Sequence, residues 1–134
     1  MDIESILTEA HAAAVAAQSG MVEDQHALDC GFAWAHAENG RQPFINQCRK
    51  ALAAKLFCAE RDFADGKIDR VERDRTKNTA ERYYGTSHWR KGWEWWSPGG
   101  APVQAIGIHQ AGANAFHLAL ARHGVTCETG SRYD

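Results

Sequence analysis

The sequence has few of the features that mark membrane, secreted and disulfide-rich proteins. Its longest apolar run without a charge covers residues 12–17, whereas a membrane-spanning helix needs about 20 residues. The first ten residues carry three acids and no Lys or Arg, whereas a secretory signal peptide begins with cations. The four cysteines include no C-x-x-C pair. We therefore expect a cytoplasmic protein with reduced, buried thiols and no membrane contact.

Positive charge is missing from the first 40 residues, which contain seven acids and no Lys or Arg. Residues 41–91 reverse this balance, with thirteen cations against seven acids, and residues 92–134 carry two cations and three acids. The net charge of −2 therefore conceals two segments of opposite sign. Such a separation can steer a charged partner, although two opposite segments that lie side by side would neutralise one another.

The length of 134 residues and the apolar and charged fractions of 44% and 24% fit a single domain over 1–134. Residues 3–19 have apolar residues at helical spacing between Asp2, which suits an N-cap, and Gly20. They predict an N-terminal helix within 1–20. Its alanines suit close packing against another element, or against the same helix of a second copy in a homodimer.

Residues 30–37 alternate between two faces, as the residues of a β-strand do. Cys30, Phe32, Trp34 and His36 share one face, and the other face carries three alanines. The alanine face leaves room for a closely packed helix.

The remaining elements follow from the same patterns and from the turn residues between them. Residues 43–64 carry a continuous apolar stripe that predicts a helix. Residues 65–86 are nearly all charged and predict a solvated, partly helical excursion. Strands are predicted at 92–97, 102–108 and 125–129, and a further helix at 109–123. The N-terminal helix is therefore followed by β-α-β-β-α-β, which predicts an α+β fold of the ferredoxin-like, split βαβ type.

Three segments are distinctive together: CGFAWAHAENGRQPFINQCRKA at 30–51, WEWWSPGG at 93–100 and QAGANAFHLALARHGVTCETGSRYD at 110–134. They resemble small accessory proteins carried by tailed bacteriophages and prophages. The resemblance implies a protein made in the host bacterial cytoplasm during phage growth. It carries over no catalytic residue, and the charged segment has no counterpart in it.

Four of the five tryptophans lie within SHWRKGWEWWSPGG, residues 87–100, together with two cations. In a strand, Trp93 and Trp95 point to one face and Trp96 to the other. Rings of this size are often core, but one face alone cannot bury them all, so at least one indole should remain near solvent. An exposed indole beside Arg or Lys can stack on a base while the cation meets a phosphate. We therefore predict a partner-binding sheet surface formed by Trp89, Arg90, Lys91, Trp93 and Trp96.

A second candidate site lies at GIHQAGANAF, residues 107–116, where a predicted strand leads into a helix. Backbone N–H groups at such a turn can bind an anion, which makes His109, Gln110 and Gly112 candidate ligand-binding residues. Gly112 could instead permit close packing between the helix and the sheet. The histidines and cysteines show no metal-ligand spacing, and no catalytic motif is present. We therefore expect no metal, no cofactor and no catalytic residue.

Three hypotheses for function remain open. The first is a non-catalytic binding protein whose tryptophan-bearing sheet surface contacts a nucleic acid or a protein. The second is an inhibitor-like protein that contacts a basic protein through its acidic N-terminal segment, with Glu4, Glu9, Glu23 and Asp24. The third is a nucleotide or small-ligand binder, or an enzyme, at the strand–helix turn within 107–116.

Overall fold

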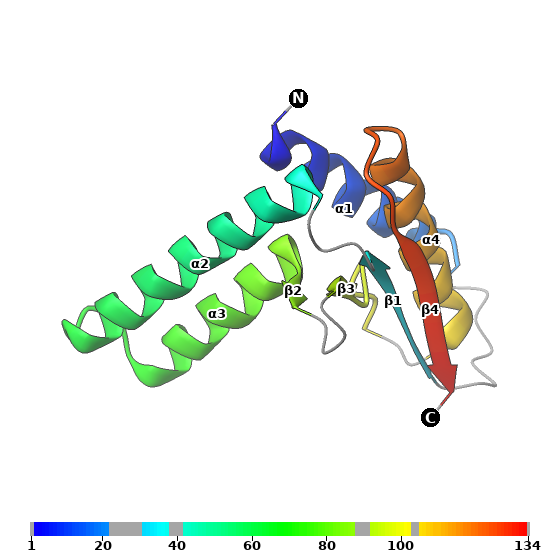
Figure 1. The fold of residues 1–134 in the computed structure, drawn as a ribbon. Helices are drawn as coiled ribbons and strands as arrows, with labels where there is room; N and C mark the ends of the chain where they lie inside the picture. The colour runs from blue at the N-terminus through cyan, green and yellow to red at the C-terminus, as the bar shows by residue number, and fades with distance from the viewer. Residues whose placement is uncertain (1, 22–30, 38–41, 88–91, 103–104, 134) are drawn as a thin grey trace.

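The computed structural model describes residues 2–21, 31–37, 42–87, 92–102 and 105–133 (Figure 1). Its elements are, in chain order, α1 (Ile3–Ser19), β1 (Gly31–Ala37), α2 (Pro43–Ala64), α3 (Arg70–Tyr84), β2 (Thr86–Ser87), β3 (Trp93–Trp96), α4 (Ile106–Ala121) and β4 (Glu128–Tyr133). The predicted α+β class and the N-terminal helix are confirmed. No helix in the described part of the chain combines the length and the apolar character that a bilayer crossing requires.

The four strands form one antiparallel sheet in the order β2-β3-β1-β4. β1 is antiparallel to β3, and β3 is antiparallel to β2, so β1 and β2 run parallel with β3 between them. By the same reasoning β3 and β4 run parallel with β1 between them. Each parallel pair is joined through one or two helices, so the sheet consists of two interleaved split βαβ units, as the order of elements predicts.

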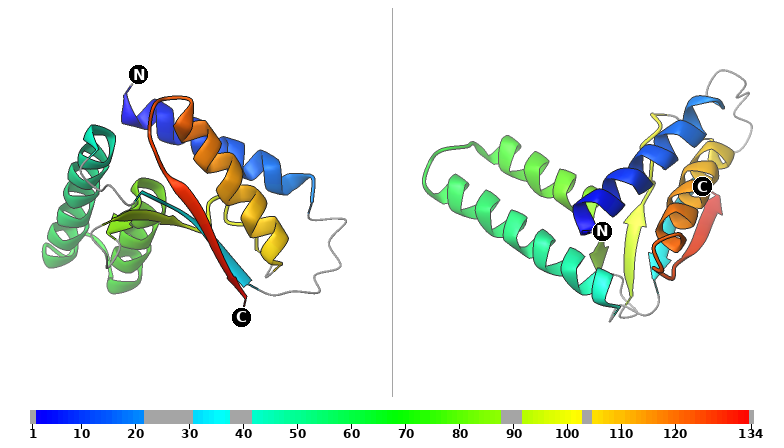
Figure 2. Two further views of the ribbon diagram at one scale, coloured as in Figure 1. Left: turned by 45° about the vertical axis from the view of Figure 1, so that its right-hand side comes forward. Right: turned by 90° about the horizontal axis from the view of Figure 1, so that it is seen from above.

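One face of the sheet packs on helices, and its small side chains explain why. Ala33, Ala35 and Ala37 of β1 are fully buried on this face, which we call the inner face. The absence of longer side chains lets α4 approach β1 closely (Figure 2). A Cβ atom at Gly31 would stand only 2.8 Å from the Ile106 side chain of α4. The alanine face of β1 therefore makes room for a closely packed helix, as predicted.

α1 lies along α4 (Figure 2). It begins at Asp2, whose carboxylate accepts a 2.8 Å hydrogen bond from the Ser5 N–H, as expected of an N-cap. Ala10 and Ala14 are fully buried, so the alanine face of α1 is used inside the fold. This burial excludes the pairing of that face with a second copy, which the sequence had left open.

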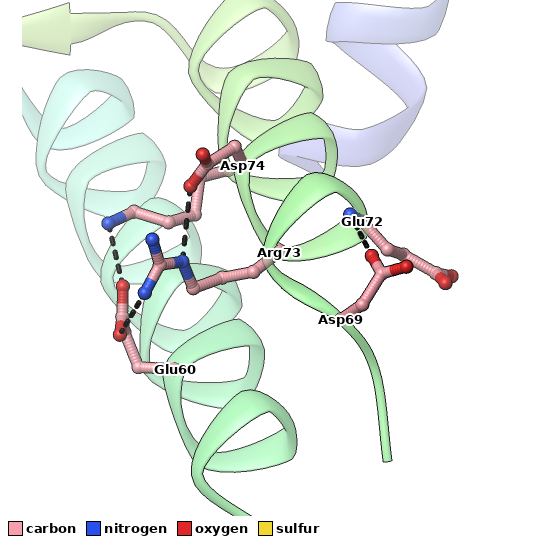
Figure 3. Close-up of polar contacts among 6 residues, drawn as sticks. Glu60, Asp69, Glu72, Arg73 and Asp74 are labelled. Carbon is pink, nitrogen blue, oxygen red and sulfur yellow. Dashed lines mark hydrogen bonds and ion pairs between the residues drawn. The ribbon is translucent and has the colours of Figure 1, made fainter. Parts of the chain in front are cut away.

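α2 and α3 form a helical hairpin that projects away from the sheet (Figures 1 and 2). α3 begins at Asp69, which accepts a 2.8 Å bond from the Glu72 N–H (Figure 3). Glu60 of α2 accepts a 2.7 Å bond from Lys77 and lies 3.9 Å from Arg73 (Figure 3). The charged segment 65–86 is therefore solvated and partly helical, as predicted. Its capping residue and its contacts with α2 make residues 70–84 a continuous helix, although most of its side chains are exposed.

The prediction of a strand at 102–108 is wrong, because α4 already begins at Ile106. Ile106 and Ile108 alternate in the sequence as in a strand, but both are buried in the first helical turn. A helix covered on more than one side loses the polar face by which a sequence reveals its period. The strand that completes the sheet is instead the short β2, and the last strand lies at 128–133 rather than at 125–129.

Candidate functional site

The outer face of the sheet, opposite the alanines, carries a cluster of aromatic rings at one end. Phe32 and Trp34 come from β1, and Trp96 comes from the end of β3, where it pairs in register with Trp34. The Trp34 and Trp96 rings are stacked, with centroids 5.4 Å apart and an interplanar angle of 8°. The Phe32 ring lies 5.5 Å from that of Trp96. We call these three residues the aromatic platform.

The platform keeps an indole accessible, although it sits on the sheet. Trp96 is 38% exposed, while Phe32 and Trp34 are half-buried. Trp34 is supported from the neighbouring strand, because its indole covers Gly130 of β4, where a Cβ atom would come within 2.6 Å of the ring. A glycine at this position is therefore required for the observed ring arrangement.

The opposite end of the outer face is ionic. His36 of β1 lies in register with Glu94 of β3 on one side and with Glu128 of β4 on the other. The His36 imidazole is 3.8 Å from the Glu128 carboxylate. Glu94 and Glu128 are therefore the next same-face residues to Trp96 and Gly130, and they border the aromatic platform.

Trp96 also lines a groove between α1, α3 and the turn that follows β3. The groove consists of two hollows of about 320 and 410 Å³ that share Thr79 and Tyr83. The first hollow is lined by His11, Val15, Arg82 and residues 96–100 in addition to the shared pair. The second is lined by Lys55, Arg75, Thr76, Ala80 and Tyr84 in addition to that pair. We call the two hollows the α3 groove.

The α3 groove is cationic. Its lining contains Lys55, Arg75 and Arg82 and no carboxylate. These three side chains form no ion pair or hydrogen bond with any other residue that the structure describes. Burial raises the pKa of Tyr83 and lowers the pKa of His11, so both rings are uncharged at neutral pH. The groove therefore presents unneutralised positive charge beside an exposed indole.

The structure divides the predicted tryptophan surface. Trp96 is exposed, as predicted, on the face opposite Trp93 and Trp95. Trp93 is only 2% exposed, and its Nε1–H donates a 2.8 Å bond to the Tyr84 carbonyl, so its predicted contact with a partner is corrected to a role in the core. Trp89, Arg90 and Lys91 lie outside the described residues.

The predicted anion site at the start of α4 is also corrected. Because the helix begins at Ile106, Gly112 lies in its interior, and its N–H group is not at a helix end. His109 is buried and its Nδ1 atom is 3.1 Å from the Ser97 hydroxyl, while Gln110 donates a 2.9 Å bond to the Ser131 hydroxyl. A Cβ atom at Gly112 would lie closer than 3.0 Å to Gln18 and to the Pro98 carbonyl oxygen. Gly112 therefore serves close packing, the alternative role that its place in the sequence also allowed.

Cys127 and His117 form a cysteine–histidine pair, although the spacing in the sequence did not suggest it. The Cys127 Sγ atom lies 3.5 Å from His117 Nδ1. Burial raises the pKa of the Cys127 thiol to about 11, so it remains protonated and is a poor nucleophile at neutral pH. Cys48 is buried as well, whereas Cys58 is exposed, contrary to the expectation of buried thiols. Within the described ranges, no group of three or more His, Cys, Asp and Glu side chains could hold a metal ion.

The acidic N-terminal segment is partly engaged inside the molecule. Glu4 accepts a 2.7 Å bond from the Tyr84 hydroxyl. Glu9 pairs with His123, and its carboxylate lies 3.8 Å from Arg122. Two of the acids proposed to meet a basic partner therefore already tie α1 to the end of α3 and to the turn after α4, while Glu23 and Asp24 lie outside the described residues.

No family model, curated protein or solved structure matches this chain. The resemblance to phage accessory proteins therefore stays a prediction. The site residues that sequence reasoning missed are of two kinds. Phe32 and Trp34 could have been predicted, because both lie on the aromatic face of the alternating segment 30–37. Lys55, Arg75 and Arg82 could not, because no sequence pattern distinguishes them from the other cations of 41–91.

Proposed function

We propose that this protein binds single-stranded nucleic acid without catalysing a reaction. Bases stack on the aromatic platform, and the phosphates of the same strand follow the cations of the α3 groove. The observation that carries the proposal is the position of Trp96, which belongs to the platform and also lines the groove. A ligand on this ring is thereby in reach of both a stacking surface and positive charge.

The platform favours a single strand over a duplex. One class of RNA-binding module is a four-stranded sheet whose aromatic rings stack bases of single-stranded RNA. Here the two central strands are β3 and β1, and they carry all three platform rings. The bases of a duplex are stacked on one another and cannot offer their faces to Trp96.

The distribution of charge favours a polyanion at this end of the molecule. The groove cations Lys55, Arg75 and Arg82 have no carboxylate in the same lining. Among the described residues of the outer face, the acids Glu94 and Glu128 stand two residues along their strands from Trp96 and Gly130. A strand that passes from the platform into the groove therefore places its phosphates near the groove cations.

The test is a titration of labelled single-stranded DNA and RNA homopolymers, followed by fluorescence polarisation. Stacking contributes about 1–3 kcal/mol per base, so Trp96→Ala should weaken binding about 5- to 150-fold. The matched control is Phe57→Ala, because Phe57 is 67% exposed on the projecting hairpin and lines neither hollow. This control should bind as the wild type does.

The salt dependence tests the groove separately. Three phosphate contacts predict a slope of about −2 when the logarithm of the association constant is plotted against that of the salt concentration. Arg82→Gln should make this slope shallower by about 0.7. The proposal is overturned if no single strand binds, or if Trp96→Ala and Phe57→Ala bind equally well.

A further inference from the structure

β4 is an edge strand of the sheet. It pairs with β1 over six positions, from Gly31 opposite Tyr133 to His36 opposite Glu128. On its other side β4 pairs with no strand of the described chain. An unpaired strand edge presents N–H and C=O groups that can hydrogen-bond to a further strand.

The sequence of β4, ETGSRY, is self-complementary about Gly130. Glu128 and Arg132 stand two residues before and after this glycine, and both share its face of the sheet. Thr129 and Ser131 flank it on the other face. Over residues 128–132, a strand with this arrangement can pair with its own copy so that each residue meets a suitable partner.

We propose that two copies of this chain join through their β4 edges, antiparallel, about a two-fold axis at Gly130. In this register Glu128 of each copy stands opposite Arg132 of the other, so two oppositely charged pairs form. Thr129 stands opposite Ser131, and the two glycines meet at the axis, where no side chains collide. The proposal does not rest on nucleic-acid binding.

The charges favour this contact, because among the described residues Glu128 has only one long ion pair and Arg132 has none. Glu128 is 69% exposed, and its ion pair with His36 is long, at 3.8 Å. The exposed Arg132 side chain forms no ion pair with any residue in the described ranges. Four residues of extended strand separate Glu128 from Arg132 by about 13 Å within one copy. Across the proposed axis, residues directly opposite one another have Cβ atoms only about 5 Å apart.

The same charges exclude the parallel arrangement. In-register parallel pairing would set Glu128 beside Glu128 and Arg132 beside Arg132, and like charges directly opposite are destabilising. The antiparallel dimer has one continuous sheet of eight strands, in the order β2-β3-β1-β4 and then its reverse. A two-fold axis normal to this sheet places both aromatic platforms on the same side. Three strand spacings, or about 14 Å, then separate the β1 strands of the two copies.

The test is sedimentation equilibrium of the full chain over a wide range of concentration. The wild type should reach a dimer. Glu128→Arg and Arg132→Glu should each weaken dimerisation about tenfold or more, because each replaces two attractive pairs by two repulsive ones. An equimolar mixture of the two variants should recover the dimer, since the two arginines of one variant then stand opposite the two glutamates of the other. The double variant that carries both substitutions should recover it as well.

Lys50→Glu serves as the control, because it reverses an exposed charge on α2, away from the edge. It should dimerise as the wild type does, and circular dichroism should show that all variants are folded. The proposal is overturned if the wild type stays monomeric, or if a dimer persists unchanged in both single variants. It is also overturned if the mixture is no more dimeric than its components. Oligonucleotide binding is measured separately, so either proposal can fail without the other.

Discussion

Two glycines of α4 provide a test of how closely this helix packs on the rest of the fold. Gly107 and Gly112 both lie in the helix, and neither has a positive φ. A Cβ atom at Gly107 would have no neighbour within 4 Å. At Gly112 it would collide with Gln18 of α1 and with the Pro98 carbonyl oxygen of the turn after β3. The same substitution by alanine should therefore have opposite effects at the two positions.

Gly107→Ala should stabilise the protein by about 0.5–1 kcal/mol, because alanine loses less backbone entropy in a helix. Gly112→Ala has the same gain but must displace the Gln18 amide. That amide is buried and bonds to the Pro98 carbonyl at 3.0 Å, to the Ile108 carbonyl at 3.2 Å and to the Ala101 N–H at 3.2 Å. Overpacking costs about 1–3 kcal/mol, and each lost hydrogen bond about 0.5–1.5 kcal/mol.

The net destabilisation expected of Gly112→Ala is about 2–4 kcal/mol, since part of the bonding can readjust. For a chain of this size it corresponds to a fall in Tm of about 10 °C, measured by circular dichroism. In a Gln18→Ala background the loss from Gly112→Ala should be smaller, because one of the two colliding groups is gone. A rise in Tm for both glycine variants would refute the close packing of α4 against α1 and the turn.

The remaining predictions concern a histidine, two thiols and a buried indole. Burial lowers the pKa of His11 in the folded protein, so as pH falls the His11 ring is protonated first in the unfolded chain. The stability contributed by the neutral ring should therefore be complete above pH 6.5 and decline below it. His11→Gln should flatten this decline, as measured by urea denaturation at a series of pH values. Labelling with a thiol reagent, mapped by mass spectrometry, should modify the exposed Cys58 rapidly and Cys127 only after unfolding, because burial raises the pKa of the latter. Trp93→Phe should cost about 1–3 kcal/mol in chemical denaturation, because it leaves the buried Tyr84 carbonyl without its donor; an unchanged midpoint would contradict that role.

Local periodicity accounts for what could be predicted of this fold. The alternation of β1 fixed its two faces, and the parity of Trp93, Trp95 and Trp96 fixed which ring opposes the other two. Both are properties of an extended backbone, in which successive side chains point to opposite sides. The helical stripe of 43–64 is local in the same sense. Helices without a clear apolar and polar face were harder to predict. In the first turn of α4 both Ile106 and Ile108 are buried, so no polar face shows the helical period. In α3 almost every residue is polar, so no apolar face shows it.

The candidate site was predictable only in part. The sequence predicted that at least one indole of the tryptophan segment stays exposed, and it included Trp96 among the candidates, because one face alone could not bury all the rings. The groove cations were not predicted, since Lys55 and Arg82 come from different helices. Arg82 lines the same hollow as Trp96, and Lys55 lines the adjoining hollow, only because α2 and α3 pair. The core role of Trp93 likewise depends on the Tyr84 carbonyl at the end of α3.

By itself the sequence determined the α+β class, the two-faced character of β1 and β3, and the separation of acidic and basic segments. The tertiary structure decided which face is covered, which ring of the tryptophan segment remains exposed and which cations lie beside it. The physical reason is that side-chain direction follows from the local backbone, whereas burial and charge neighbourhood depend on contacts between residues far apart in the chain. Trp34, Trp96 and Gly130 form one surface only because β1 lies between β3 and β4.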